Sequence, residues 1–282
     1  TVSDFVEHYL DDASVRVLGC YIEGFEPLDG MRFVELIREH RRRGRAVIAF
    51  KAGKTALGAQ AAASHTASLA GDYAAARALF VGAGAVVAET LSDFEDWTRT
   101  FSMLYERVPA GRRVALISNA GFECSVSMDA LFDLELGRFA AATRETLKSC
   151  LPAIAHADNP IDATPMATTA QFVSAVEAIV ADPGIDAVVV SPVPPTPALD
   201  TLAPDPSGTH RENCHLPGSL AQELVRVFRQ SGKPIVANVD SGRIYDESVD
   251  VMQRGGIPTF RKIDRATRAL SEYCRVRAIL PS

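Results

Sequence analysis

The chain has 282 residues, of which 47% are hydrophobic and 23% are charged, and its formal net charge is −6. This composition is typical of a globular protein with a hydrophobic core, and the length allows one large domain or two ordinary ones. The negative charge and the lack of a basic stripe argue against a nucleic-acid partner. The five cysteines form no CxxC pair, and no apolar run reaches the roughly 20 residues of a membrane span. We therefore expect a cytoplasmic protein without a disulfide framework.

Short apolar runs rich in Val and Ile alternate with helical patterns along the chain. We expect strands over Val15–Ile22, Ala46–Lys51, Ala85–Glu89, Arg113–Ser118, Ala187–Ser191, Pro234–Val239 and Pro258–Phe260. We expect helices over Gly30–Arg43, Asp72–Gly82, Leu91–Glu106, Glu123–Leu134, Thr143–Cys150, Thr169–Ala181, Ser219–Gln230, Asp246–Arg254 and Arg265–Arg275. Strands that alternate with helices predict an α/β protein with parallel sheets.

The segment Val108–Arg112 is the best candidate for a domain boundary, because a helix ends there and a new strand follows. We expect one α/β domain over residues 1–108 and a second over residues 109–282. The first has only about three expected strands and begins at Thr1 without a Met, so we expect it to be incomplete at its N-terminus. Pro192–Gly218 is rich in proline and is the longest irregular segment. Loops of this length are usually functional or disordered.

Residues 63–71, Ala-Ser-His-Thr-Ala-Ser-Leu-Ala-Gly, form the most informative motif of the chain. His65 lies between two hydroxyl residues, Ser64 and Thr66, and small residues flank all three. Small neighbours leave room around an imidazole, whereas a core histidine is more often packed by large apolar side chains. The motif predicts a loop with a functional histidine, and the alternative is an ordinary polar loop residue.

Two further candidates follow expected strands. Glu23 ends the strand Val15–Ile22, and Asn119-Ala120-Gly121 joins the strand Arg113–Ser118 to a helix. In open parallel sheets ligands bind beyond the carboxyl ends of the strands, and a helix N-terminus there favours an anion. A carboxylate on this edge could orient an imidazole and raise its basicity. The alternatives are a solvated loop acid and a plain strand–helix turn.

Two other patterns do not meet the requirements of a site. The segment Ala52–Thr55 resembles the end of a phosphate-binding P-loop, but Ile48 stands where that motif needs its first glycine. His210, Cys214 and His215 lie in the proline-rich segment without a standard ligand spacing. The sequence therefore predicts neither a P-loop nor a metal site.

Taken together, these motifs resemble those of the NDP-forming acyl-CoA synthetases, the superfamily that includes ADP-forming acetyl-CoA synthetase and succinyl-CoA synthetase. The resemblance covers essentially the whole chain and depends on the order of its motifs. Its residues are Tyr21–Gly24, Lys51–Thr55, Ser64–Gly71, Ser118–Cys124, Asn159–Thr164 and Gly256–Pro258. It implies two flavodoxin-like, succinyl-CoA synthetase-like domains.

The resemblance also implies site residues and a reaction. His65 becomes phosphorylated, Glu23 steadies the phosphohistidine, and Asn119, Ala120 and Gly121 cradle the phosphoryl group together with Ser64 and Thr66. Acyl-CoA, ADP and phosphate interconvert with acid, CoA and ATP. The implied co-substrates are ATP or ADP with Mg²⁺, CoA and phosphate. The implied partners are CoA-binding and ATP-grasp domains, fused upstream or on a separate chain, a small organic acid, and further subunits of a homo- or hetero-oligomer.

Three departures from the family pattern leave alternatives open. Ala67 replaces a glycine, Phe122-Glu123-Cys124 replaces Gly-Pro-Gly, and neither a dinucleotide-type glycine-rich turn nor a nucleotide-binding lobe is visible. Glu123 would repel phosphate if it faced the anion site, whereas an outward acid suits a helix N-terminus. The alternatives are a diverged, non-catalytic CoA or acyl-CoA binding or scaffold protein, and an acyl or carbamoyl transferase on the same scaffold.

Overall fold

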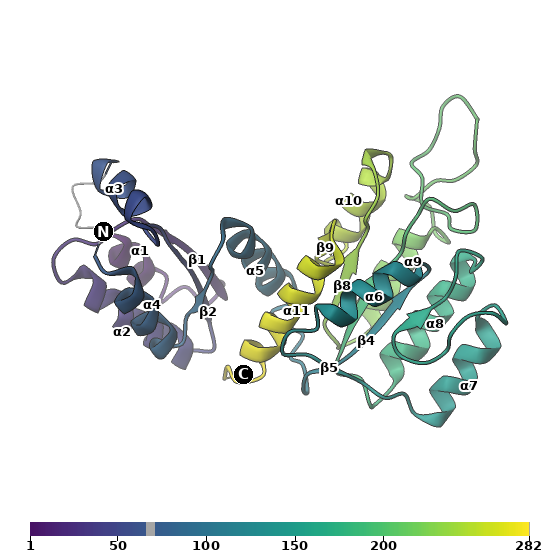
Figure 1. The fold of residues 1–282 in the computed structure, drawn as a ribbon, viewed down its shortest axis with the longest axis horizontal. Helices are drawn as coiled ribbons and strands as arrows, with labels where there is room; N and C mark the ends of the chain where they lie inside the picture. Colours follow the sequence, from purple (N-terminus) through teal and green to yellow (C-terminus); the bar gives the residue numbers. More distant parts are fainter. Residues whose placement is uncertain (66–70, 282) are drawn as a thin grey trace. The chain divides into compact units, whose positions relative to one another are not determined.

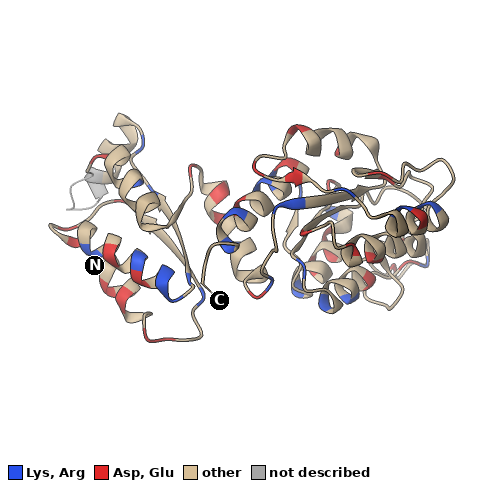
Figure 2. Ribbon diagram, turned by 90° about the horizontal axis from the view of Figure 1, so that it is seen from below, with Lys and Arg blue, Asp and Glu red and all other residues tan. Residues whose placement is uncertain are grey.

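The chain folds into two compact units, each described separately below. The computed structural model describes residues 1–65 and 71–281. The first unit comprises Thr1–Tyr105 together with Ile279–Ser282, and the second comprises Glu106–Ala278. The first unit thus ends close to the boundary expected after Val108, and the end of the chain packs with the first unit instead of the second. Lys and Arg are interspersed with Asp and Glu over both units (Figure 2).

The first unit is a parallel sheet between helices (Figure 1). Its elements are α1 (Val2–His8), β1 (Val17–Ile22), α2 (Asp29–Arg42), β2 (Ala46–Lys51), α3 (Ala56–His65), α4 (Tyr73–Ala83), β3 (Val86–Val87) and α5 (Leu91–Leu104). The three strands are parallel and lie in the order β1-β2-β3 among the described residues. Leu18, Cys20 and Ile22 pack in the core with α2 and α4. Gly19 faces the other way, toward Thr98 of α5, so helices cover both faces.

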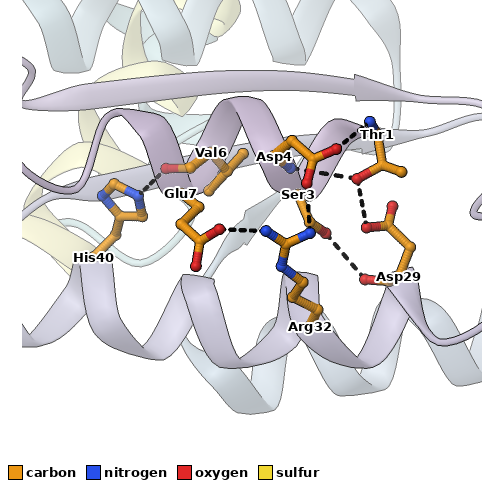
Figure 3. A network of polar contacts seen from close by, with 8 residues as sticks. All are labelled: Thr1, Ser3, Asp4, Val6, Glu7, Asp29, Arg32 and His40. Carbon is orange, nitrogen blue, oxygen red and sulfur yellow. Dashed lines mark hydrogen bonds and ion pairs between the residues drawn. The ribbon is translucent and has the colours of Figure 1, made fainter.

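The contact between α1 and α2 combines a polar network with a buried histidine (Figure 3). Arg32 of α2 pairs with Asp4 and Glu7 of α1. Ser3, which is fully buried, donates to the carbonyl of Asp29 at 3.0 Å. His40 is also fully buried, and its Nε2 lies 2.9 Å from the carbonyl oxygen of Val6. These contacts hold α1 against the start and the end of α2.

The segment that leads to His65 is helical, so the loop predicted over residues 63–71 is wrong for residues 63–65. Helix α3 runs from Ala56 to His65. Alanine has the highest helix propensity of all residues, and this stretch is rich in it. The hydroxyl oxygen of Thr55 accepts a hydrogen bond of 3.1 Å from the N–H of Gly58 and so supports the first turn of α3. Small residues that were interpreted as space around a loop histidine therefore build a helix.

The second unit is a larger parallel sheet with helices on both faces (Figure 1). Its elements are β4 (Arg113–Ser118), α6 (Gly121–Asp129), β5 (Glu135–Leu136), α7 (Ala141–Cys150), β6 (Ile161–Asp162), α8 (Thr169–Ala181), β7 (Ala187–Ser191), α9 (Leu220–Gln230), β8 (Ile235–Asn238), the 3-10 helix η1 (Arg243–Tyr245), α10 (Asp246–Arg254), β9 (Thr259–Phe260) and α11 (Ile263–Arg277). Helix α6 begins and ends earlier than the predicted Glu123–Leu134. The proline-rich segment between β7 and α9 contains no helix or strand, as expected.

The strand order of the second unit is β5-β4-β7-β8-β9, and β6 pairs with β4 as well. The short strands β5 and β6 occupy successive parts of one edge of β4, at Arg113–Val114 and at Ile117–Ser118. Counted as one broken strand, they give the order 2-1-3-4-5 of a flavodoxin-like sheet. The predicted α/β fold with two parallel sheets is confirmed. Within residues 1–65 and 71–281, no helix combines the length and apolar character that a membrane crossing needs.

Candidate functional site

Glu23 lies at the carboxyl edge of the first sheet, directly after β1. Its Oε1 accepts a hydrogen bond of 3.2 Å from the hydroxyl of Tyr21, whose ring stacks on Phe50 of β2. The side chain is half-buried, so its carboxylate remains accessible while the tyrosine restrains it. The backbone at this position is fixed as well, because the ammonium group of Lys51 donates to the carbonyl of Glu23 at 2.8 Å. The fold therefore presents Glu23 as a restrained carboxylate.

Lys51 is an unusual buried cation at the end of β2. Its side chain is only 3% exposed, and its ammonium group also donates to the carbonyl of Ala52 at 2.8 Å. Burial lowers the pKa of Lys51, and the nearby Glu23 opposes that change. The cation thus fastens the ends of β1 and β2 to each other. It lends positive charge to the same edge of the sheet.

A charged cluster at the same edge was missed by sequence reasoning. Glu89, which follows β3, accepts from Lys54 at 2.6 Å and from Arg77 at 2.6 Å. Tyr73 adds a hydroxyl at 3.3 Å. The hydrogen bonds from Lys54 and Arg77 lower the pKa of Glu89 to about 2. Glu89 and its partners come from three segments of the chain, so only the parallel register of β2 and β3 could have indicated the cluster.

Ser64, His65 and Thr66 are the remaining predicted site residues of the first unit. The backbone of Ser64 and His65 ends α3, and the side chains of both lie outside the described residues, as does Thr66. Their roles stay predictions. What the structure adds is that a helix leads from the carboxyl end of β2 toward His65.

Asn119 marks the point in the second unit where the strand order reverses. It follows β4, and its side chain bridges to the segment after β7. Its Nδ2 donates to the carbonyl of Val193 at 3.0 Å, and its Oδ1 accepts from the N–H of Val193 at 2.7 Å. The crevice between strands 1 and 3 of such a sheet is its usual ligand position. The amide of Asn119 is therefore engaged in shaping this position, and its predicted contact with a phosphoryl group stays a prediction.

The turn that follows has the features of a helix N-terminus without a side-chain cap. Helix α6 begins at Gly121, its N-cap is Ala120, and no side chain of the described residues caps it. A Cβ on Gly121 would lie 3.0 Å from Oδ2 of Asp162, so glycine permits a close approach. Uncapped N–H groups and the helix dipole favour an anion. The turn at the end of β4 is thus a helix start without a side-chain cap, and its role in phosphate binding stays a prediction.

Glu123 points into the core of the second unit, which is neither of the two placements considered from the sequence, toward the anion site or outward. Its side chain is fully buried, while its neighbour Phe122 is 53% exposed. Its Oε2 accepts from Nδ2 of Asn238 at 3.2 Å, and the same amide group donates to the hydroxyl of Ser191 at 3.0 Å. Its Oε1 is buried and has no hydrogen-bond partner among the described residues. Burial raises the pKa of Glu123 to about 6, with Asp240 contributing in the same direction.

The site residues therefore come from the carboxyl ends of two separate sheets. Glu23 and α3 belong to the first unit, and Asn119, Ala120 and Gly121 belong to the second. Sequence reasoning named these positions but missed the buried partners that restrain them. In the second unit, the sequence feature that could have indicated these partners is a polar residue at the last position of an apolar strand. Ser191 and Asn238 are such residues.

The strand order and the strand–helix turn define a flavodoxin-like α/β protein. Residues 1–101 match the family model of the succinyl-CoA ligase like flavodoxin domain. The solved acetyl-coenzyme A synthetase 1 of Ca. Korarchaeum cryptofilum, determined with phosphate and ADP, superposes with a TM-score of 0.83 at 27% identity. The match covers 99% of this chain and 57% of that one.

Two curated relatives come from Pyrococcus furiosus. The alpha subunit of its ADP-forming acetate–CoA ligase I is 32% identical over 95% of this chain and 54% of the relative. The alpha subunit of ligase II is 30% identical over 92% of this chain and 53% of the relative. The chain thus spans about half the length of these relatives. The resemblance to the NDP-forming acyl-CoA synthetases that the motifs predicted is confirmed by these matches.

Proposed function

We propose that this chain is the phosphohistidine-bearing part of an NDP-forming acid–CoA ligase. In this proposal residues 1–108 carry the phosphohistidine segment, and residues 109–282 form the second flavodoxin-like ligase domain. His65 is the phosphoryl carrier, Glu23 orients its imidazole, and the turn Asn119–Gly121 binds the phosphoryl group. The observation that carries the proposal is the uncapped N-terminus of α6 at the strand-order reversal, within a chain homologous to such ligases.

The proposed reaction has three steps. Phosphate attacks the thioester of acyl-CoA, and acyl phosphate and CoA result. A ring nitrogen of His65 then attacks phosphorus, the P–O bond to the acyl group breaks, and the acid leaves. Finally an oxygen of ADP attacks the phosphohistidine, and the N–P bond breaks to give ATP. Phosphoryl transfer of this kind depends on positioning and on stabilisation of negative charge, which a helix N-terminus supplies without a competing base.

The chain's own residues supply parts of this chemistry. Tyr21 holds Glu23, and a carboxylate hydrogen-bonded to an imidazole fixes its tautomer and stabilises its charged form. Asn119 fixes the turn by bonding to Val193. The proposed co-substrates are ADP or ATP with Mg²⁺, CoA, phosphate and a small organic acid. We propose that CoA-binding and ATP-grasp domains, on a longer chain or a partner subunit, complete the enzyme.

The burial of Glu123 supports this proposal over a disabled scaffold. A carboxylate facing the anion at the first turn of α6 would oppose phosphate binding. Glu123 instead contacts Asn238 and lies beneath the carboxyl ends of β7 and β8. The replacement of the family's Gly-Pro-Gly residues therefore adds no facing acid at the predicted anion position, where the carboxylate of Asp162 already lies beside Gly121. It does place the exposed ring of Phe122 at the first turn.

Phosphorylation of the enzyme assembled with its ATP-grasp partner tests the proposal. On incubation with ATP labelled at its γ-phosphate and Mg²⁺, we expect acid-labile, base-stable label that mass spectrometry places on His65. The variant His65→Asn should carry no label. Glu23→Gln should slow labelling by about 10- to 100-fold, since the imidazole loses its orienting group.

The matched control is His156→Asn, because His156 is exposed and belongs to the second unit. This variant should be labelled like the unmodified protein. A protein with an active ATP-grasp domain that takes up no label would contradict the proposal and favour a binding or scaffold role. Label that persists in His65→Asn would contradict the assignment of the carrier.

A further inference from the structure

A cysteine, a histidine and a glutamate meet at one place in the second unit, apart from the site described above. Single ligand atoms of Cys214, His215 and Glu247 all lie within 4.8 Å of one another. His215 Nε2 is 2.9 Å from Oε2 of Glu247. Cys214 is fully buried, whereas His215 and Glu247 are exposed. A thiol, an imidazole and a carboxylate are the three side-chain groups that bind Zn²⁺ in proteins.

The fold holds the two adjacent ligand residues in a defined turn. The N–H of Cys214 donates to the carbonyl of Leu202 at 2.8 Å, and the hydroxyl of Ser219 donates to the carbonyl of Cys214 at 3.0 Å. The N–H of His215 donates to Oδ1 of Asn213 at 3.0 Å. These bonds fix the backbone on both sides of the Cys-His pair. Neighbouring side chains can therefore face the same point, which an extended strand would not allow.

The third group comes from a different element. Glu247 lies in the first turn of α10, 32 residues beyond His215. Sequence spacing could not reveal this cluster, because the glutamate is far along the chain from the Cys-His pair. A metal ion here would join the proline-rich segment between β7 and α9 to helix α10.

We propose that Cys214, His215 and Glu247 bind one thiophilic divalent cation, and that Zn²⁺ is the metal that fits best. Zn²⁺ binds thiolate at about 2.3 Å and imidazole or carboxylate at about 2.0–2.2 Å, so its ligand atoms lie within the observed spread. Three protein ligands leave the fourth tetrahedral position for water. On binding, the thiol releases its proton to solvent, and the hydrogen bond between His215 and Glu247 gives way to two metal bonds.

An ion pair alone does not account for the arrangement. An exposed His–Glu pair contributes little to stability, because solvent screens it. It also gives no role to the buried thiol of Cys214 beside this pair. Oxygen-preferring cations such as Mg²⁺ disfavour thiolate and imidazole ligands, which makes them poor occupants.

The test titrates the metal-free full chain with ZnCl₂ and, in parallel, with CoCl₂. We expect one Zn²⁺ per chain by elemental analysis after dialysis, and a thiolate-to-cobalt charge-transfer band with Co²⁺. The variants His215→Asn and Glu247→Gln should each weaken Zn²⁺ binding by about 100-fold or more, as ligand loss should exceed the loss seen for outer contacts. Cys214→Ser should abolish the charge-transfer band.

The matched control is Cys150→Ser, a half-buried cysteine of α7 in the same unit. It should keep both the stoichiometry and the band. Because Cys214 is buried, its variant can fail to fold, and the two exposed ligands, His215 and Glu247, then decide the result. Unchanged Zn²⁺ affinity in His215→Asn and Glu247→Gln, a band without Cys214, or no bound metal in the unmodified chain would each overturn the site.

Discussion

Glu123 has two carboxyl oxygens in different situations. Oε2 accepts from Asn238, whereas Oε1 is buried and has no partner among the described residues. Burial of a carboxylate that has one oxygen without a hydrogen-bond partner favours its protonated form. The pKa of Glu123 rises from 4.5 to about 6 for this reason. Between about pH 4.5 and pH 6, the folded second unit thus holds a proton at Glu123 that the unfolded chain releases.

The first prediction concerns the substitution Glu123→Gln. Because the pKa is raised on folding, the contribution of this group to stability is complete below pH 4.5 and is lost as the pH rises through 6. The shift corresponds to about 2 kcal/mol. A neutral amide removes this loss, so the variant should gain up to about 2 kcal/mol over the unmodified chain between pH 4.5 and pH 8. Hydrogen exchange of amides in β7 and β8 measures this opening free energy.

The control for this prediction is Glu145→Gln. Glu145 lies on α7 with an exposed side chain that pairs with Lys148. Its substitution should leave the pH dependence of the second unit unchanged. The same pH dependence in Glu123→Gln as in the unmodified chain would show that the buried carboxyl does not titrate in this range.

The direction of Glu123 could not be predicted from sequence. Binary patterning places Phe122 inward and an acid at the helix start outward. The structure has the reverse, since Phe122 is 53% exposed and Glu123 is fully buried. Successive residues of a helix point about 100° apart, so a helix that turns Glu123 into the core turns Phe122 toward another side. The partners that accept the buried acid come from β7 and β8, which no local pattern reveals.

At the scale of elements, long regular segments were predictable and short ones were not. The strands β4 and β7 and the helices α8 and α10 have the bounds expected from sequence. Continuous apolar runs define such strands, and Thr168 with Gln171 forms a capping box at the start of α8. The strands β5 and β6 have two residues each, and only their pairing with β4 makes them strands. Such pairing depends on tertiary structure.

The side chain of Asn159 makes hydrogen bonds to the backbone at the edge of β4 where β5 ends and before β6 begins. Its Oδ1 accepts from the N–H of Leu116 at 3.0 Å, and its Nδ2 donates to the carbonyl groups of Val114 at 2.8 Å and Gly137 at 2.9 Å. The side chain thus serves backbone groups of β4 between the residues that β5 and β6 pair. One amide performs the role of a missing strand residue.

The second prediction follows from this position. Asn159→Ala removes the partner of the Leu116 N–H and of the Gly137 carbonyl, whereas the carbonyl of Val114 still accepts from the N–H of Gly137. Each buried group that loses its partner costs about 1–3 kcal/mol. We expect the second unit to lose at least about 2 kcal/mol, measured by denaturant unfolding followed by hydrogen exchange in β4. Asn213→Ala is the control, because Asn213 serves a turn outside the sheet. A loss below about 0.5 kcal/mol in Asn159→Ala would contradict the role of Asn159 as a ladder substitute.

At the scale of the whole molecule, the alternation of strands and helices predicted the fold. The same pattern could not predict which titratable side chains are buried in each unit. The first unit buries His40, and the second buries Glu123. Desolvation disfavours the charged form of both groups, so it lowers the pKa of His40 and raises that of Glu123. The same physical cause therefore acts in opposite senses on the pH dependence of the two units.

The third prediction is that acidification from pH 8 to pH 5 shifts the two units in opposite directions through these groups. The unfolded chain binds a proton at His40 that the folded first unit resists, so this group lowers the stability of that unit as the pH falls below about 6.5. Glu123 raises the stability of the second unit over the same range. Fluorescence of Trp97, the one tryptophan of the sequence, reports unfolding of the first unit, and hydrogen exchange in β8 reports the second.

Variants separate these contributions. His40→Gln retains a side-chain donor for the carbonyl of Val6 and cannot titrate, so it should flatten the pH dependence reported by Trp97 and leave that of β8 unchanged. Glu123→Gln should do the converse. If either variant changed the pH dependence of both reporters equally, the titrating groups would act on the molecule as one cooperative body, and independent folding of the two units would be ruled out.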